Sequence, residues 1–306
     1  MNARRLLRFG GLALSLVAIA WIVHRFASGS ALELLAQTPL APAMLAACLA
    51  AAAFAYALAM GLPALAWWRI VSGLAPHAPP ALPTLGTYAA SQYGKYLPGN
   101  VAHYALRHVW SRRYDIPHAS LALASILEAA LLVLGALAVV VGAGVRPAVV
   151  ARLVDPRIAV VGVVLALVAL AIALRVVRRL GWFERMHVPM PAPSMMLAAL
   201  ACYVAFFLAC AALVAALAHA LGYPPVSFAL IAAASAASWL AGFVVIGAPA
   251  GLGVREAAFI ALAGPALGED RALLLIGLFR IVTFLGDTLV LAAGTAVLRL
   301  QRKPAP

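Results

Sequence analysis

Long stretches without a charged residue decide what this chain can fold into. Residues 40–68 and 195–218 contain no Asp, Glu, Lys or Arg. Each exceeds the roughly 20 apolar residues with which a helix crosses the ~30 Å hydrocarbon core of a bilayer. Of the whole chain, 66% is hydrophobic and 10% is charged, against about 25% charged residues in soluble domains. We therefore predict an all-α polytopic membrane protein, because the alternating pattern of β-barrel strands is not seen.

The apolar pattern predicts about six full spans and two interrupted segments. The spans are expected at about 6–26, 40–70, 118–144, 157–177, 194–221 and 271–299. Segments 84–110 and 227–264 are broken by proline, glycine and charged residues, and we expect broken or re-entrant helical hairpins there. The alternative is a count of eight helices, in which both interrupted segments also cross.

The basic residues favour the re-entrant alternative. With a cytoplasmic N-terminus, hairpins that return to their own side place "RHVWSRR" (107–113) and "RVVRRLGWFER" (175–185) in the cytoplasm. Single crossings would place both clusters outside, against the positive-inside rule. We expect a bacterial cytoplasmic (inner) membrane, with both termini cytoplasmic. The net charge of +13 is then explained by the basic residues that set the topology, and it does not indicate nucleic-acid binding.

The order of the segments suggests an inverted repeat within a single membrane domain, residues 1–306. Residues 1–150 and 151–306 would each contain two spans, a broken hairpin and a span. Aligning Pro98 with Pro249 also aligns Gly135 with Gly286. Inverted repeats with discontinuous helices near the midplane are a recurring architecture of secondary transporters.

The two interruptions are predicted to line a cavity, because unpaired backbone groups are not tolerated against lipid. In "GKYLPGN" (94–100), Pro98 lacks an N–H and Gly99 permits positive φ, so the helix can end there. In "GAPAGLGVRE" (247–256), glycines precede a new helix. Its free first-turn amides and Arg255 suit an anionic group such as phosphate. Glu256 suits the first turn electrostatically, and its role is expected to be either capping of this helix or carrying a proton.

Six charges are expected at membrane depth: Lys95, Arg255 and Arg280 against Glu128, Glu256 and Asp287. Charges there are costly in lipid, so they are predicted to face one another or water. Arg280 and Asp287 lie seven residues apart, ~10 Å along one helix, and each needs a partner from another helix. A structural salt-bridge network is the alternative to a transport role.

Other features have simpler interpretations. The aromatic residues Trp67, Trp68, Tyr88, Trp110 and Trp182 are interpreted as an interfacial belt. Among the histidines only His103, close to the first break, is a candidate site residue. No Walker, dinucleotide-binding or serine-elbow motif is found. The sequence therefore predicts no metal, no cofactor and no catalytic residue, and a transporter in place of an enzyme.

The motifs "GKYLPGN", "HYALRHV" (103–109), "GAPAGLGVREAA" (247–258) and "LFRIVTFLGD" (278–287) resemble those of the lysylphosphatidylglycerol synthase transmembrane-region family, also called flippase-like. The resemblance extends from the first helix to about Leu300 and implies movement of lipid headgroups between leaflets. Matching motif positions are Lys95, Pro98, Gly99, Gly251, Gly253, Arg255, Glu256 and Arg280. Ala250 departs from an expected glycine, and no synthase domain is expected, so the substrate need not be lysylphosphatidylglycerol.

The function expected from these features is lipid translocation. A phospholipid or polyprenyl-linked headgroup, anionic or phosphate-containing, would enter the polar interior between the halves. The alternative is a lipid-binding scaffold or a membrane subunit for a separate glycosyltransferase or lipid-modifying enzyme. The candidate substrate-binding residues are Lys95, Pro98, Gly99, Asn100, His103, Glu128, Gly251, Gly253, Arg255, Glu256, Arg280 and Asp287.

Overall fold

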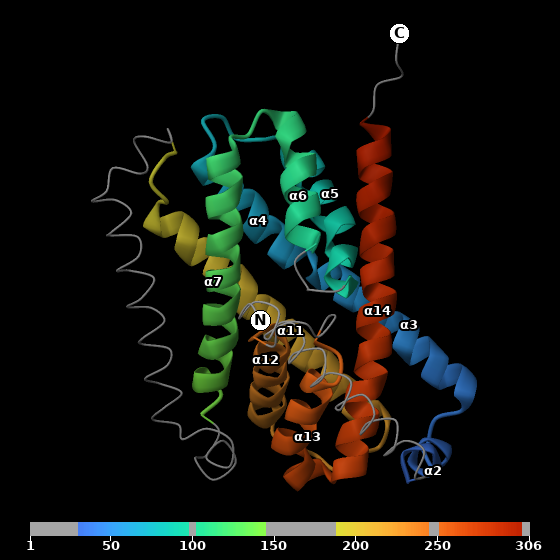
Figure 1. The fold of residues 1–306 in the computed structure, drawn as a ribbon. Helices are drawn as coiled ribbons and strands as arrows, with labels where there is room; N and C mark the ends of the chain where they lie inside the picture. Colours follow the sequence, from blue (N-terminus) through green and yellow to red (C-terminus); the bar gives the residue numbers. More distant parts are fainter. Residues whose placement is uncertain (1–29, 98–101, 145–187, 245–250, 302–306) are drawn as a thin grey trace, which may run out of the picture.

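The computed structural model describes residues 30–97, 102–144, 188–244 and 251–301. Every regular element in these ranges is helical (Figure 1). In chain order the elements are α2 (Ser30–Ala36), α3 (Pro42–Ala59), α4 (Gly61–Leu74), α5 (Ala81–Ser91), the 3₁₀ helix η1 (Gln92–Tyr96), α6 (Ala102–Ser111), the 3₁₀ helix η2 (Arg112–Tyr114), α7 (His118–Gly142), α11 (Pro193–Ala220), α12 (Phe228–Val244), α13 (Val254–Leu267) and α14 (Glu269–Leu300).

Four apolar helical segments are long enough to cross a membrane, and they match four of the predicted spans. The spans at about 40–70, 118–144, 194–221 and 271–299 are found as Pro42–Leu74 (α3 with α4), α7, α11 and α14. The predicted spans 6–26 and 157–177 lie outside the described residues. The prediction of an all-α polytopic membrane protein is confirmed.

Both segments predicted to be broken form helical hairpins interrupted at the tip. In the first, α5 continues into η1 and the chain becomes extended at Leu97 before α6 returns. In the second, α12 ends at Val244 and α13 begins at Val254. Just before α13, Gly251 and Gly253 have φ values of 69° and 83°, which only glycine adopts without strain.

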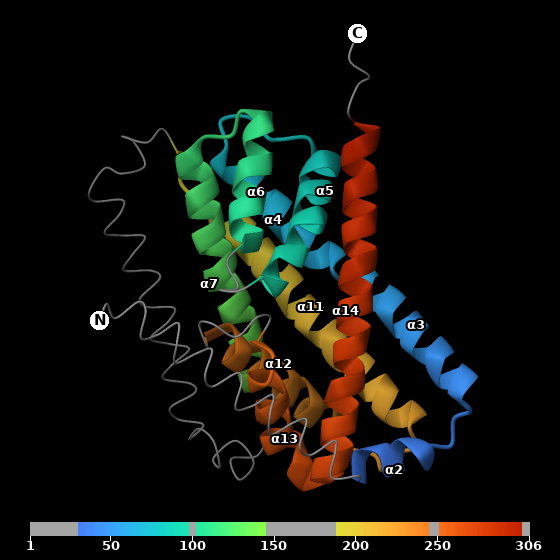
Figure 2. The ribbon, with the colours of Figure 1, turned by 45° about the vertical axis from the view of Figure 1, so that its right-hand side comes forward.

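The two hairpins occupy opposite ends of the bundle. Helices α5 and α6 lie together at the end where the C-terminus emerges, whereas α12 and α13 lie at the other end (Figures 1 and 2). Short connections join the feet of each hairpin to the neighbouring spans: residues 75–80 lead from α4 into α5, and Gly268 alone separates α13 from α14. Each hairpin is therefore re-entrant, returning to the side from which it starts.

Opposed hairpins are what an inverted repeat would produce. The boundary proposed near residue 150 falls outside the described residues. The division into half-repeats 1–150 and 151–306 therefore stays a prediction.

Helix α14 packs against α3, α5 and α13, and small residues bring it close to the first two. A Cβ atom at Gly286 would lie 2.8 Å from the Ala53 carbonyl oxygen of α3, and one at Gly294 would lie 2.8 Å from the Gly86 carbonyl oxygen of α5. Glycine at such crossings permits close approach of helix backbones in membranes. This packing fixes the height of Asp287, the residue after Gly286, relative to the first hairpin.

Candidate functional site

A cavity lies where residues from the tips of both hairpins come together. It contains about 1080 Å³ of empty space, counting its open mouth. Lys95 of η1 and Arg255 in the first turn of α13 both line it, with side chains from α3, α4, α5, α6, α7, α11, α12 and α14. Of the predicted site residues, the cavity is lined by Lys95, His103, Glu128, Arg255 and Arg280.

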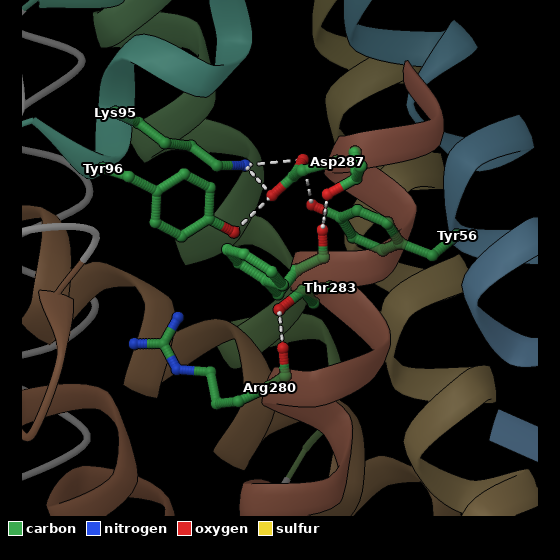
Figure 3. A network of polar contacts seen from close by, with 8 residues as sticks. Tyr56, Lys95, Tyr96, Arg280, Thr283 and Asp287 are labelled. Carbon is green, nitrogen blue, oxygen red and sulfur yellow. Dashed lines mark hydrogen bonds and ion pairs between the residues drawn. The ribbon is translucent and has the colours of Figure 1, made fainter. Parts of the chain in front are cut away.

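The carboxylate of Asp287 accepts contacts from one ammonium and two hydroxyl groups (Figure 3). Lys95 Nζ lies 2.7 Å from Asp287 Oδ2, and the Tyr96 hydroxyl donates to Oδ2 at 2.6 Å. The Tyr56 hydroxyl of α3 donates more weakly to Oδ1 at 3.5 Å. The carboxylate is fully buried, whereas the Lys95 side chain is 20% exposed. The pair therefore joins the tip of the first hairpin to α14, with the lysine at the edge of the cavity.

Glu256 connects the second hairpin to α14. Its Oε1 pairs with Arg280 Nε, and its Oε2 accepts a hydrogen bond of 2.7 Å from the Gly253 N–H. The second bond caps α13, because the N–H of the N-cap residue Gly253 has no partner within the helix. Of the two roles considered for Glu256, the structure shows the capping contact. The expectation that Arg280 and Asp287 each take a partner from another segment is confirmed.

Arg107 is buried, so the prediction that it belongs to a cytoplasmic cluster is wrong. Its side chain is completely buried in α6, and Nη1 lies 2.5 Å from Glu128 Oε2 of α7. Its Nε also donates to Ser91 Oγ at 3.3 Å. Arg112 and Arg113, which belong to the same cluster, are exposed as predicted. Arg107 differs in lying one helical turn after His103, on the face that turns inward.

The aromatic belt is likewise wrong for two of its members. Trp67 is fully buried and Tyr88 is nearly so. Arg107 Cζ lies 4.0 Å from the Tyr88 ring centroid and 4.6 Å from that of Trp67. These rings stabilise the guanidinium through cation–π contact, so they serve the buried ion pair and not the membrane interface.

Arg255 differs from the other interior cations. No carboxylate in the described part of the chain forms an ion pair with it, and its Nε is buried without a hydrogen-bond partner. Its nearest aromatic contact is Trp239, whose ring centroid lies 5.8 Å from Cζ. A Cβ atom at Gly242 or Gly251 would lie 2.7 Å from Nε. The two glycines thus leave room for the side chain beside the cavity.

The remaining predicted residues have mixed outcomes. His103 is buried on the cavity wall, and its Nδ1 has no hydrogen-bond partner in the described structure. Gly251 and Gly253 shape the turn into α13. Pro98, Gly99 and Asn100 lie outside the described residues.

Several residues of this site were not predicted. Arg107 carries a recognisable signal in its spacing from His103, and Tyr96 adjoins Lys95 in the first broken motif. Tyr56 and Trp239 stand within apolar helices, where the sequence pattern does not separate a cavity residue from a packed one. Their roles depend on which helix face turns toward the hairpin tips.

Chemically, the cavity suits an anion bound near apolar material. Lys95 and Arg280 are partly exposed donors, each already paired with a carboxylate, and Arg255 adds a cation that has no carboxylate partner among the described residues. Aromatic side chains also line the cavity, among them Phe206, Phe207, Trp239, Phe243 and Phe279. Such a lining accommodates a charged group attached to a hydrophobic body.

Comparison with known families gives a match over most of the chain. Residues 8–290 match the family described as the lysylphosphatidylglycerol synthase TM region. A comparison with curated proteins finds no match.

Proposed function

Because this chain belongs to the lysylphosphatidylglycerol synthase TM region family, we propose that it is a lipid translocase, which moves a phospholipid or polyprenyl-linked headgroup between leaflets. The family assignment supports a membrane domain concerned with lipids. The step from lipid handling to translocation is our proposal. It places the chain in the bacterial cytoplasmic membrane, with both termini in the cytoplasm, and assigns it no catalytic residue.

The observation that carries the proposal is the state of Arg255. An arginine at membrane depth is costly unless it is paired or hydrated, and this one borders a cavity with no carboxylate partner among the described residues. A cation in the first turn of a helix is also unfavourable with the helix dipole. A bound phosphate would relieve both costs, because it would accept hydrogen bonds from the guanidinium and the first-turn amides together.

In this mechanism the headgroup enters between the hairpin tips while its acyl chains stay in lipid. Arg255 and Arg280 contact the phosphate, and Lys95 contributes from the opposite hairpin. Glu256 and Asp287 hold Arg280 and Lys95 in position when the cavity contains no headgroup. Hairpins that enter from opposite ends (Figure 2) give the headgroup a polar route that continues from one half of the bilayer to the other.

The test is leaflet exchange of tail-labelled fluorescent lipids in proteoliposomes. We expect exchange above that of empty liposomes, and we expect Arg255→Ala to abolish it while the protein remains folded in detergent. The fold should survive because no carboxylate in the described part of the chain loses its partner when Arg255 is removed. Arg299→Ala is the matched control, since Arg299 is exposed in the last turn of α14 and does not line the cavity.

Two results would contradict the proposal. Exchange no faster than in empty liposomes, with folded protein confirmed, would exclude translocation and favour the lipid-binding scaffold or the membrane subunit of a separate lipid-modifying enzyme. Co-purification of such an enzyme in a fixed ratio would identify the latter. Normal exchange by Arg255→Ala would leave translocation standing and exclude the assigned site.

A further inference from the structure

The interior charges around the cavity do not balance. Three cations each form an ion pair with a described carboxylate: Lys95 with Asp287, Arg107 with Glu128, and Arg280 with Glu256. Arg255 is a fourth cation and has no described carboxylate as a partner. The described lining and its direct partners therefore carry one net positive charge. An uncompensated charge in a site of low dielectric favours a ligand that cancels it.

The same pairing leaves no acceptor for a cationic headgroup. Glu128 is the one acidic residue among the described cavity-lining side chains, and Arg107 neutralises it at 2.5 Å. Asp287 and Glu256 are each occupied by a cation of their own. An ammonium group brought into the cavity would meet Lys95, Arg255 and Arg280 without a free carboxylate, and like charges at close range are repulsive.

Uncharged hydrogen-bonding groups remain available on the walls. Ser235 Oγ and His103 Nδ1 line the cavity and have no hydrogen-bond partners within the described structure. Gln92 and Thr283 add further polar side chains to the lining. Such groups bind hydroxyls, which can both donate and accept.

We propose that the cavity selects a phosphodiester monoanion whose outer part is an uncharged polyol, such as glycerol or a sugar. This inference rests on the proposed function and specifies the substrate of the same site. A single negative charge cancels the charge of Arg255. A zwitterionic headgroup leaves that charge in place and adds an ammonium, whereas a phosphomonoester, which carries about −1.5 to −2 at neutral pH, overcompensates it.

Binding and exchange are measured separately on the full chain. Thermal unfolding in detergent is recorded with short-chain phosphatidylglycerol, phosphatidylethanolamine or phosphatidic acid, and exchange is recorded with tail-labelled forms of the same lipids in phosphatidylcholine liposomes. We expect phosphatidylglycerol to be preferred over each of the others by about tenfold or more in apparent affinity and in exchange rate, the selectivity of one charge-assisted contact.

Variants at one position test the origin of the selectivity. Arg255→Gln removes the unpaired charge and should bring the apparent affinities for phosphatidylglycerol and phosphatidylethanolamine together. Arg255→Lys keeps the charge and should keep the preference. Arg299→Gln makes the same chemical change at an exposed position outside the cavity and should leave the preference as it is.

The outcomes separate this inference from the proposed function. Equal stabilisation and equal exchange for all three headgroups would overturn the selectivity and leave translocation standing. Selective stabilisation by phosphatidylglycerol without any exchange would support the selectivity and overturn translocation. Stabilisation by inorganic phosphate equal to that by the short-chain lipid would assign the cavity to a free anion and overturn the headgroup inference.

Discussion

The guanidinium of Arg107 and the carboxylate of Glu128 form a completely enclosed ion pair, with Nη1 and Oε2 2.5 Å apart and side-chain exposures of 0% and 2%. The pair joins the returning helix of the first hairpin, α6, to the span α7. Because Glu128 also lines the cavity, this pair both fixes the hairpin and neutralises a carboxylate that would otherwise repel an anion. Because Glu128 is already paired with Arg107, it is not available as a counterion for Arg255.

Removal of one partner of this pair should be strongly destabilising. We expect Arg107→Ala to lower the free energy of unfolding by about 3–5 kcal/mol, the usual result when a buried charge loses its counterion. Replacing both residues, as in Arg107→Met with Glu128→Leu, should recover a large part of that loss because neither charge is then left buried. Denaturant unfolding in mixed micelles measures both changes.

Arg299→Ala is the control for this series, because an exposed substitution away from specific contacts changes stability by about 0.5 kcal/mol or less. An Arg107→Ala loss no greater than that of the control would show that the pair does not hold the hairpin.

Lys95 and Asp287 should be energetically coupled across the interface between η1 and α14. We expect Lys95→Ala and Asp287→Ala to be non-additive, with an interaction energy of about 0.5–3 kcal/mol in a double-mutant cycle. Asp287→Ala alone should cost more than Lys95→Ala, because it also leaves the Tyr96 hydroxyl without its 2.6 Å acceptor. Additive losses would mean that the pair of Figure 3 does not join the hairpin to the span.

Gly251→Ala should disturb the position of Arg255. The glycine has φ of 69°, which strains any residue with a Cβ, and that Cβ would lie 2.7 Å from Arg255 Nε. We expect a loss of about 1–3 kcal/mol together with weaker lipid exchange. Thermal unfolding and the proteoliposome assay measure the two effects on one preparation.

Gly61→Ala is the matched substitution, since no atom lies within 4 Å of the Cβ built there and its φ is ordinary. It should be neutral or stabilising, by up to about 1 kcal/mol. Equal losses for the two alanine variants would exclude a local effect on Arg255.

The two contacts of Glu256, with the Gly253 N–H and with Arg280, should have separable effects on stability. Glu256→Gln keeps an oxygen that can accept the bond from the Gly253 N–H but removes the charge opposite Arg280, which is 18% exposed. Glu256→Ala removes both and should therefore be less stable than the glutamine variant by about 1 kcal/mol, the typical contribution of a helix cap. Melting temperatures in detergent compare the two. Identical values would show that the cap contributes nothing to α13.

The sequence by itself determined the class of protein, four of its spans and both interruptions. These properties follow from local quantities, because hydropathy adds up along each segment and proline and glycine act on the backbone where they stand. The suitability of Glu256 for the first turn of α13 could also be predicted, since a negative charge there is favourable with the helix dipole. The sequence also predicted that Arg280 and Asp287 need partners from other segments, because the rise of a helix fixes their separation.

The tertiary structure decided which charges meet. Arg107 and Arg112 stand in one basic cluster, yet one is completely enclosed and the other is exposed, because the rotation of α6 against α7 selects the face that turns inward. The height of α14 depends on close helix crossings at Gly286 and Gly294, whose partners lie more than 200 residues away in the chain. Charge pairing is therefore a property of packing geometry. Only the packed structure shows that Lys95, Arg107 and Arg280 pair with carboxylates and that Arg255 has no carboxylate partner among the described residues.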